Sequence, residues 1–363
     1  MIGRTLALYF AGRFAKMVLA MFLFSFMLIG AITFVELFTR AAQGGDFDGL
    51  KLAVVALFRV PSISEETLPF ATLFGSIAAF VIANRRLEIV VARAAGVSAW
   101  QFLLPACCVG LVLGIIATTA YNPFAASLLS WSNVLRATVF ANAPADPTGP
   151  TGPVWLRQIA DGQESIIGAS QSYDQGLKLS NVTAILFGEA NQFRERVDAA
   201  RAEYAGAEWV FHNATVTAAN QPPRIVGVYR LPTTLTPSEV RQTFESVDTV
   251  SFWTLPTLID TARRAGLSAD TYELRYNALL SRPILLLAMV LIAAIVSLRF
   301  SRSRDLGWMI LTGVGIGFML YVVTKIAHDL GSGGIVPPLV AAWLPAFVAI
   351  LMGVTVLLHL EDG

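Results

Sequence analysis

The chain has 363 residues, of which 55% are hydrophobic and only 14% charged, a composition typical of an integral membrane protein. Its formal net charge of +1 excludes the strongly basic footprint of a nucleic-acid-binding protein. The only cysteines, Cys107 and Cys108, are adjacent in an apolar run, so the sequence offers neither a disulfide across the fold nor a cysteine metal site.

The first apolar run, Met17–Leu37, follows a positively charged N-terminus. It is too long for the apolar region of a signal peptide, and no small-residue cleavage site follows closely, so we interpret it as an uncleaved first span. Glu36 and Arg40 stand four residues apart near its far end. The simpler interpretation is an ion pair whose groups reach toward the membrane surface, and the alternative is a functional carboxylate at the membrane edge.

Two more spans follow in the first third of the chain. Residues 41–66 are polar and contain glycine, which predicts a short external connection, and the run Thr67–Ala83 predicts the second span. The third span is expected at Phe102–Tyr121. Gly110 and Gly114 within it have the GxxxG spacing that permits close helix packing, a spacing that is common in apolar helices.

The charged stretch between the second and third spans, residues 84–100, predicts a compact amphipathic helix. Its apolar face is formed by residues at i, i+3, i+4 and i+7, namely Leu87, Val90, Val91 and Ala94. Glu88 lies off that face in the first turn, where a carboxylate suits the helix dipole, and Gly96 is expected to end the helix. Such a helix either docks into a partner or rests on the bilayer, and the plainer alternative is a positive loop that fixes topology.

The character of the sequence changes between residues 122 and 275. A Pro/Gly-rich segment at 143–153 marks a boundary, and short runs with period-two features follow it, separated by turn-forming clusters. These runs are Glu164–Ala169, Val182–Phe187, Val197–Ala205, Trp209–Ala218 and Ile225–Leu231. They predict a soluble all-β domain, a sandwich or jelly roll.

Three more apolar runs follow, Tyr276–Leu298, Leu306–Ile326 and Ile335–Leu358. Six spans place both termini on one side of the membrane. With that side inward, nine Lys and Arg residues lie in the inner segments and four in the short outer connections, which predicts cytoplasmic termini and an external β domain. The expected fold is therefore membrane α-helical, with six transmembrane helices, three on each side of a soluble all-β domain.

Motifs for catalysis or cofactor binding are absent from the sequence. There is no G-x-x-x-x-G-K-[ST], no G-x-S-x-G and no H-E-x-x-H, and the three histidines lie far apart without partners at ligand spacing. We therefore expect no catalytic residue, no metal site and no cofactor in this chain. A large external domain beside a charged inner stretch, with no energy source, favours an assembly whose ATPase is a separate protein.

Three segments resemble those of a known family, the LptF/LptG permeases that extract lipopolysaccharide from the bacterial inner membrane. The run LPFATLFG at 68–75 is similar to the family's P-x-A-x-L-x-G, and RLEIVVARAAGVS at 86–98 is similar to its E-L-x-x-x-R-A-A-G-x-S coupling motif. The segment FVELFTR at 34–40 is similar to the LptG branch. The plan of three spans, a periplasmic β-jellyroll and three spans covers the whole chain.

The resemblance implies a multi-pass inner-membrane permease in a heterodimer of LptF and LptG, driven by two copies of the ATPase LptB, which uses ATP and Mg, and joined by LptC. Lipopolysaccharide would enter between the first span of one subunit and the fifth of the other, then pass to the periplasmic β domains. The expected divisions are 1–122 for spans one to three with a coupling helix at 84–98, 123–260 for the β-jellyroll, and 261–363 for spans four to six.

The resemblance also implies roles for particular residues. The helix that would seat in a groove of LptB comprises Arg85, Arg86, Leu87, Glu88, Val91, Arg93 and Gly96. Arg40 would face the lipid A phosphates, to which a guanidinium is well matched. The lateral-gate candidates are Phe34, Leu37, Gly313, Gly317 and Tyr321. The alternatives are the LptF seat of the same complex, or a membrane receptor or scaffold with a ligand-binding β domain.

Overall fold

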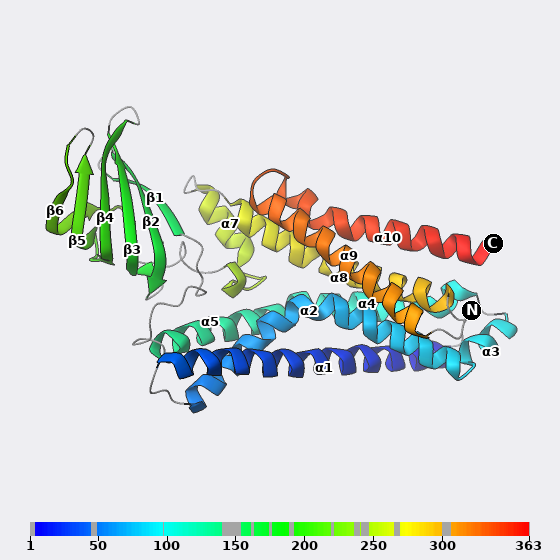
Figure 1. Ribbon diagram of the computed structural model, residues 1–363. Coiled ribbons are helices and arrows are strands. Elements are labelled where there is room, and N and C mark those ends of the chain that lie inside the picture. Colours follow the sequence, from blue (N-terminus) through cyan, green and yellow to red (C-terminus); the bar gives the residue numbers. More distant parts are fainter. Residues whose placement is uncertain are drawn as a thin grey trace. The chain divides into compact units, whose positions relative to one another are not determined.

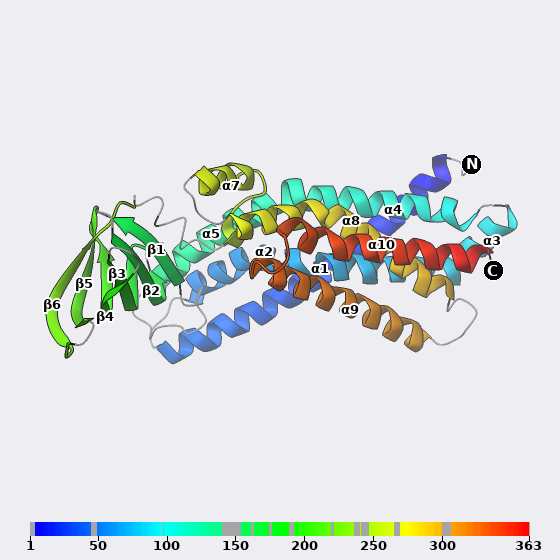
Figure 2. The same cartoon turned by 90° about the horizontal axis from the view of Figure 1, so that it is seen from above.

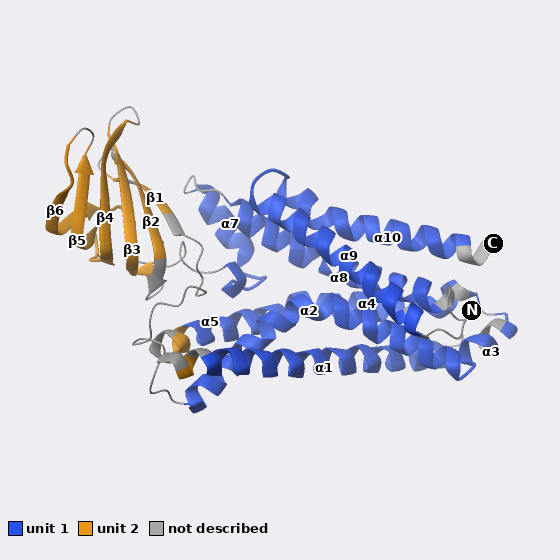
Figure 3. Ribbon diagram, viewed as in Figure 1, with its two compact units in different colours: residues 1–39, 49–133, 247–363 blue, residues 40–48, 134–246 orange. Residues whose placement is uncertain are grey.

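The computed structural model describes residues 4–44, 49–96, 98–139, 154–160, 163–173, 176–188, 192–218, 221–235, 240, 247–264, 269–299 and 306–362. The chain divides into two compact units, shown in two colours in Figure 3. Unit 1 comprises residues 1–39, 49–133 and 247–363, and unit 2 comprises residues 40–48 and 134–246. Each unit is described by itself.

Unit 1 is helical (Figure 1). Its first half contains α1 (Arg4–Gly44) up to residue 39, α2 (Gly49–Arg85), the short α3 (Glu88–Ala94) and α4 (Ala99–Ile116). The helix α4 continues through the π-helix η1 (Ala117–Tyr121) into α5 (Asn122–Val139), of which unit 1 contains the part up to residue 133. Its second half contains the 3-10 turn η4 (Val247–Thr249), α7 (Leu255–Arg264), α8 (Asp270–Arg299), α9 (Leu306–Ser332) and α10 (Pro338–Asp362).

Six helical segments among the described residues are long and apolar enough to cross a membrane. They are Thr5–Thr39, Gly49–Arg85, Trp100–Arg136, Asp270–Ser297, Ile310–Ser332 and Pro338–His359. Three precede the β strands in the chain and three follow them. The predicted fold class, a membrane α-helical protein of three plus three spans around an all-β domain, is confirmed.

The predicted external connection at 41–66 is wrong from residue 49 onward, because α2 begins at Gly49 and runs for 37 residues. The prediction rested on the polar, glycine-containing residues at 43–49, whereas residues 49–66 form the first half of α2. Pro61 and Glu65 within this half are buried inside the fold. Likewise, the third helical run continues past its predicted end at Tyr121 as α5, and the described strands begin at residue 154.

Glycines allow the helices of unit 1 to approach one another closely. A Cβ added at Gly114 would collide with the backbone of Pro283 in α8, and one at Gly110 would come within 2.8 Å of Val290 Cγ2. The packing role predicted for this GxxxG pair is therefore confirmed, and its partner is α8. At the crossing of α1 and α2, a Cβ at Gly75 would come within 2.5 Å of Val18 Cα.

Unit 2 contains one six-stranded antiparallel sheet whose strands follow the order of the sequence (Figure 2). The strands are β1 (Val154–Ala160), β2 (Gln163–Tyr173), β3 (Lys178–Phe187), β4 (Phe193–Tyr204), β5 (Glu208–Ala218) and β6 (Arg224–Pro232). Alternate side chains of β3 and β5 are buried, as the period-two pattern predicts, and Trp209 and Phe211 are the largest side chains of this core.

Candidate functional site

The predicted amphipathic stretch between α2 and α4 is shorter in the structure than in the prediction. Arg85 ends α2, Arg86 and Leu87 form a turn, and the helix α3 comprises only Glu88–Ala94. Leu87 has a φ of 61°, which is unusual for a residue other than glycine. The single helix predicted at 84–98 is therefore wrong in its bounds, because this left-handed residue separates α3 from α2. Gly96, with a φ of 82°, ends the stretch as predicted.

The apolar face predicted for this stretch points away from the chain. Leu87, Val90 and Val91 are 59%, 53% and 66% exposed, whereas Ile89 is 7% exposed and belongs to the core of unit 1. A cluster of large apolar side chains on a short helix between two spans is the kind of surface that contacts another molecule. Of the cationic candidates, Arg85 and Arg86 are exposed, and the side chain of Arg93 lies outside the described residues.

Glu88 points the other way, toward α1. Arg13 Nη1 lies 2.6 Å from both carboxylate oxygens of Glu88, and the two side chains are only 13% and 21% exposed. The Tyr9 hydroxyl donates to Glu88 Oε1 at 3.4 Å and accepts from Arg13 Nη1 at 3.3 Å. We call this group the Arg13–Glu88 pair. The sequence indicated Glu88 but gave no sign of its partner, which lies 75 residues away.

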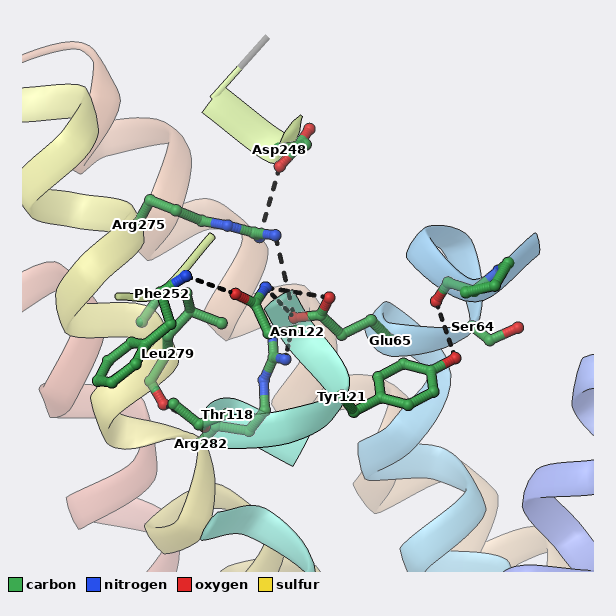
Figure 4. A network of polar contacts seen from close by, with 12 residues as sticks. Ser64, Glu65, Thr118, Tyr121, Asn122, Asp248, Phe252, Arg275, Leu279 and Arg282 are labelled. Atoms are coloured by element: carbon green, nitrogen blue, oxygen red, sulfur yellow. Dashed lines mark hydrogen bonds and ion pairs between the residues drawn. The ribbon is translucent and has the colours of Figure 1, made fainter. Parts of the chain in front are cut away.

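A second charged cluster lies deep in unit 1, around Glu65 of α2 (Figure 4). Glu65 is 3% exposed and accepts hydrogen bonds from Arg282 Nη1 and from Asn122 Nδ2, the latter at 2.9 and 3.2 Å. Arg275 Nη2 lies 3.9 Å from the same carboxylate and contacts Asp248 with its Nη1 at 3.4 Å. We call these five residues the Glu65 network. Two guanidinium groups and an amide offset the cost of burying one carboxylate.

The Glu65 network also holds the segment through which the chain returns from unit 2. Asn122 Oδ1 accepts the backbone N–H of Phe252 at 2.9 Å, while its amide nitrogen donates to Glu65. Beside it, Trp253 Nε1 donates to the carbonyl of Thr119 at 3.0 Å. Asn122 thus joins the buried carboxylate of α2 to the segment that leads into α7 and α8.

Proline and a π-helix shape the surroundings of this network. Pro283 has no N–H, so the carbonyl of Leu279 lacks its helical partner, and the Thr118 hydroxyl donates to it at 2.8 Å. Tyr121 similarly donates to the carbonyl of Pro61 at 3.0 Å. Both donors belong to η1, and a π-turn of this kind commonly marks a functional position in a helix.

The position of the Glu65 network along the helix axes can be related to the thickness of a membrane. About 30 Å of helix separates Glu65 from Arg85, and about 25 Å separates Arg282 from Arg299, at 1.5 Å per residue. Since a hydrocarbon core is about 30 Å thick, the network is near the edge of the membrane opposite α3. Isolated charges beside apolar runs are a signal for such sites, but assignment of 41–66 to a loop concealed this one.

The lateral-gate candidates fall into two groups. On α9, added Cβ atoms at Gly313 and Gly317 would meet Ile77 and Leu73 of α2, and the ring of Tyr321 lies 5.3 Å from that of Phe70, also in α2. The candidates on α1 are Leu37, which is fully buried, and Phe34, which stacks on Phe38 of the same helix. The side chain of Arg40 lies outside the described residues.

Burial differs strongly between the six membrane helices. The most apolar windows of Thr5–Thr39 and Ile310–Ser332 are each only 11% buried, less than in any of the other four spans. The helices α1 and α9 therefore expose most of their apolar surface. Among the residues that the structure describes, no three His, Cys, Asp or Glu side chains come together as metal ligands.

Comparison with known proteins gives one family and several relatives. The family model for the lipopolysaccharide export system permease LptF/LptG matches residues 8–359. The lipopolysaccharide export system permease protein LptG of Escherichia coli K12 is 23% identical over 343 residues, which cover 92% of this chain and 93% of the relative. The protein of the same name from Haemophilus influenzae is 23% identical over 338 residues, covering 88% and 89%.

Proposed function

This chain belongs to the LptF/LptG family of lipopolysaccharide export permeases, and on that premise we propose that it is the LptG-like subunit of an ABC transporter. The transporter extracts lipopolysaccharide from the inner membrane and passes it through the periplasmic β domain toward the outer membrane. A separate ATPase supplies the energy, so this chain binds no cofactor of its own. The relatives named LptG, which match nearly end to end, support the LptG seat over the LptF seat.

The observation that carries the proposal is the exposed apolar surface of Leu87, Val90 and Val91. We propose that it docks into a groove of an LptB-like ATPase dimer, with Arg85, Arg86, Arg93 and Gly96 completing the contact. This places α3 and both termini in the cytoplasm and the β domain in the periplasm, in agreement with the distribution of Lys and Arg in the sequence.

The low burial of α1 and α9 supports a second contact, with an LptF-like permease. In a heterodimer, each of these helices would face the opposite one in the partner, and lipopolysaccharide would enter between them. Phe34, Leu37, Gly313, Gly317 and Tyr321 are the gate candidates on these two helices. We further propose that Arg40 contacts lipid A phosphates and that an LptC-like subunit joins on the periplasmic side.

The experiment replaces Val90 and Val91 together by Asp and purifies the chain from membranes with its partners. We expect the variant to retain the LptF-like subunit and to lose the ATPase and its coupled hydrolysis, because two buried, unpaired carboxylates oppose docking. Val90→Ile with Val91→Ile is the matched control and should retain both partners.

Two results would contradict the proposal. Full retention of the ATPase by the Asp variant would mean that α3 is a topology loop, and a receptor or scaffold would then be the better interpretation. Co-purification of the wild-type chain with an LptG-like instead of an LptF-like partner would assign it the LptF seat.

A further inference from the structure

Resting on the proposed function, we propose that Asn122 is a positioning residue that clamps both connections of the β domain to the membrane helices. The chain leaves unit 1 for the β domain after residue 133 and re-enters it at residue 247. Within unit 1, residues 117–133 belong to the outgoing connection and residues 247–254 to the returning one. Asn122 joins the two connections to each other and to α2, and this clamp gives the movement driven by the ATPase a fixed point.

The outgoing connection is held against α2 at several points along its length. The Tyr121 hydroxyl donates to the carbonyl of a proline in α2 at 3.0 Å, and Asn122 Nδ2 donates to Glu65 at 2.9 Å. Ten residues further along α5, the Ser132 hydroxyl donates to the carbonyl of Val55 at 3.0 Å. Asn122 and Ser132 are 0% and 1% exposed, so water does not replace their bonds, and α5 cannot slide along α2 without breaking them together.

The returning connection is held by the same part of the chain. Asn122 Oδ1 accepts the backbone N–H of Phe252 at 2.9 Å, and Trp253 Nε1 donates to the carbonyl of Thr119 at 3.0 Å. The ring of Phe252 stacks on that of Tyr276 in α8, with 5.4 Å between their centroids and 14° between their planes. Three segments that lie far apart in the sequence therefore meet at one amide group.

An amide is well suited to this position because it offers a donor and an acceptor on one rigid group. A leucine of similar size at residue 122 would leave the N–H of Phe252 without its acceptor and Glu65 without one of its donors. An aspartate would still accept from Phe252 but would place a second carboxylate beside Glu65. Since Glu65 also accepts from Arg282, the clamp extends from the two connections to α8.

The place of the clamp along the helices gives it a role in transport. About 30 Å of α2 separates Glu65 from Arg85, so the clamp lies at the end of the bundle opposite the docking helix α3. A force applied at α3 moves the near ends of the helices against the far ends only if the far ends are held. The clamp holds them by joining α2, α8 and both connections. When it opens, the far ends yield, and ATP is hydrolysed without release of lipopolysaccharide.

The test uses the complex with the LptF-like and LptB-like subunits in lipopolysaccharide-containing vesicles, and measures ATP hydrolysis and lipopolysaccharide release to a soluble binding protein. Asn122→Leu should keep hydrolysis within about twofold of wild type and lower release about tenfold. The exchange Asn122→Asp with Glu65→Gln should restore release to within about threefold, since the new carboxylate accepts from Phe252 and the new amide donates to it. Thr119→Val, which removes a hydroxyl bonded only to the carbonyl of Ile115 in its own helix, is the matched control.

The outcomes separate this proposal from the proposed function. Unchanged release in Asn122→Leu, an equal fall of hydrolysis and release, or an exchange no better than Asn122→Asp alone would each overturn the positioning role. If Asn122→Leu does not assemble with the LptF-like subunit, Trp253→Phe gives the answer, because Trp253 is 62% exposed and its substitution removes only one outer bond of the clamp. This variant should raise the ATP hydrolysed per lipopolysaccharide released about threefold, and a wild-type ratio would overturn the proposal. A failure of the proposed function would appear in the wild-type complex itself, which would neither bind the ATPase nor release lipopolysaccharide.

Discussion

The two arginine–carboxylate clusters of unit 1 use the same chemistry in different surroundings. Glu65 is 3% exposed and is held by two arginines of α8 and an asparagine of α5. Glu88 keeps 21% of its side chain exposed and is held by one arginine and a distant tyrosine. A buried charge with several partners cannot exchange them without leaving another charge unpaired, whereas a partly solvated pair can open and close.

This difference assigns the clusters different physical roles. The Glu65 network joins α2, α5, α8 and the returning segment at Asp248 and Phe252, so it behaves as a fixed element of the bundle. The Arg13–Glu88 pair joins only α1 and the short α3. A force applied to α3 would therefore be expected to move the ends of the helices near α3, while the parts of α2, α5 and α8 that the Glu65 network joins stay in place.

The largest effect should come from removing the buried carboxylate. Glu65→Ala leaves the buried Arg282 without its carboxylate and Arg275 with only the more exposed Asp248, and it should lower the free energy of unfolding by about 3–5 kcal/mol. Arg13→Gln, which breaks the partly exposed pair, should cost only about 1–2 kcal/mol. Thermal unfolding of the two purified variants in detergent checks this, and equal losses would abolish the distinction between the clusters.

A smaller effect should follow from separating the helices beside the network. Gly114→Ala places a methyl group against the backbone of Pro283, next to Arg282, and should destabilise the chain by about 1–3 kcal/mol. Gly12→Ala is the matched control, because nothing lies within 4 Å of its Cβ and alanine favours helix. The two substitutions should therefore shift the unfolding temperature in opposite directions, and a stabilising Gly114→Ala would show that α4 and α8 do not approach closely.

The smallest effect concerns unit 2, where the partner of the Glu195 carboxylate is the neutral hydroxyl of Tyr229 and not an arginine. Burial, and then the hydrogen bond that its hydroxyl donates to Glu195 Oε1 at 2.8 Å, raises the pKa of Tyr229 above its ordinary value. The folded chain favours the neutral phenol, so this stabilisation is complete below about pH 10 and is lost as the pH rises further. Tyr229→Phe should cost about 1 kcal/mol at neutral pH.

Protease susceptibility of the sheet at about pH 8 and about pH 11 measures this dependence. The wild-type chain should lose more protection at the higher pH than Tyr229→Phe does. An identical alkaline loss in both proteins would mean that other groups carry it.

The elements that repeat a local pattern could be predicted from the sequence, and the contacts between distant segments could not. The period-two runs at Val182–Phe187 and Trp209–Ala218 became strands, and Gly110 with Gly114 became a helix contact. Glu65 and Arg282 are separated by 217 residues, and no local pattern joins them. Glu65 was assigned to a connection because the polar, glycine-containing residues at 43–49 indicated a loop, although α2 begins at Gly49.

The π-helix at Ala117–Tyr121 has a rotational consequence. A π-turn accommodates one more residue than an α-turn, and each residue of an α-helix advances the side chains by about 100° around the axis. The glycines of α4 pack on α8, and Asn122 at the start of α5 donates to Glu65. The single extra residue of the π-turn sets the rotation about the helix axis that allows both contacts. Loss or gain of one residue here would leave the helix nearly the same length but would turn α5 about its axis. The π-helix therefore fixes the rotation of α5 relative to α4.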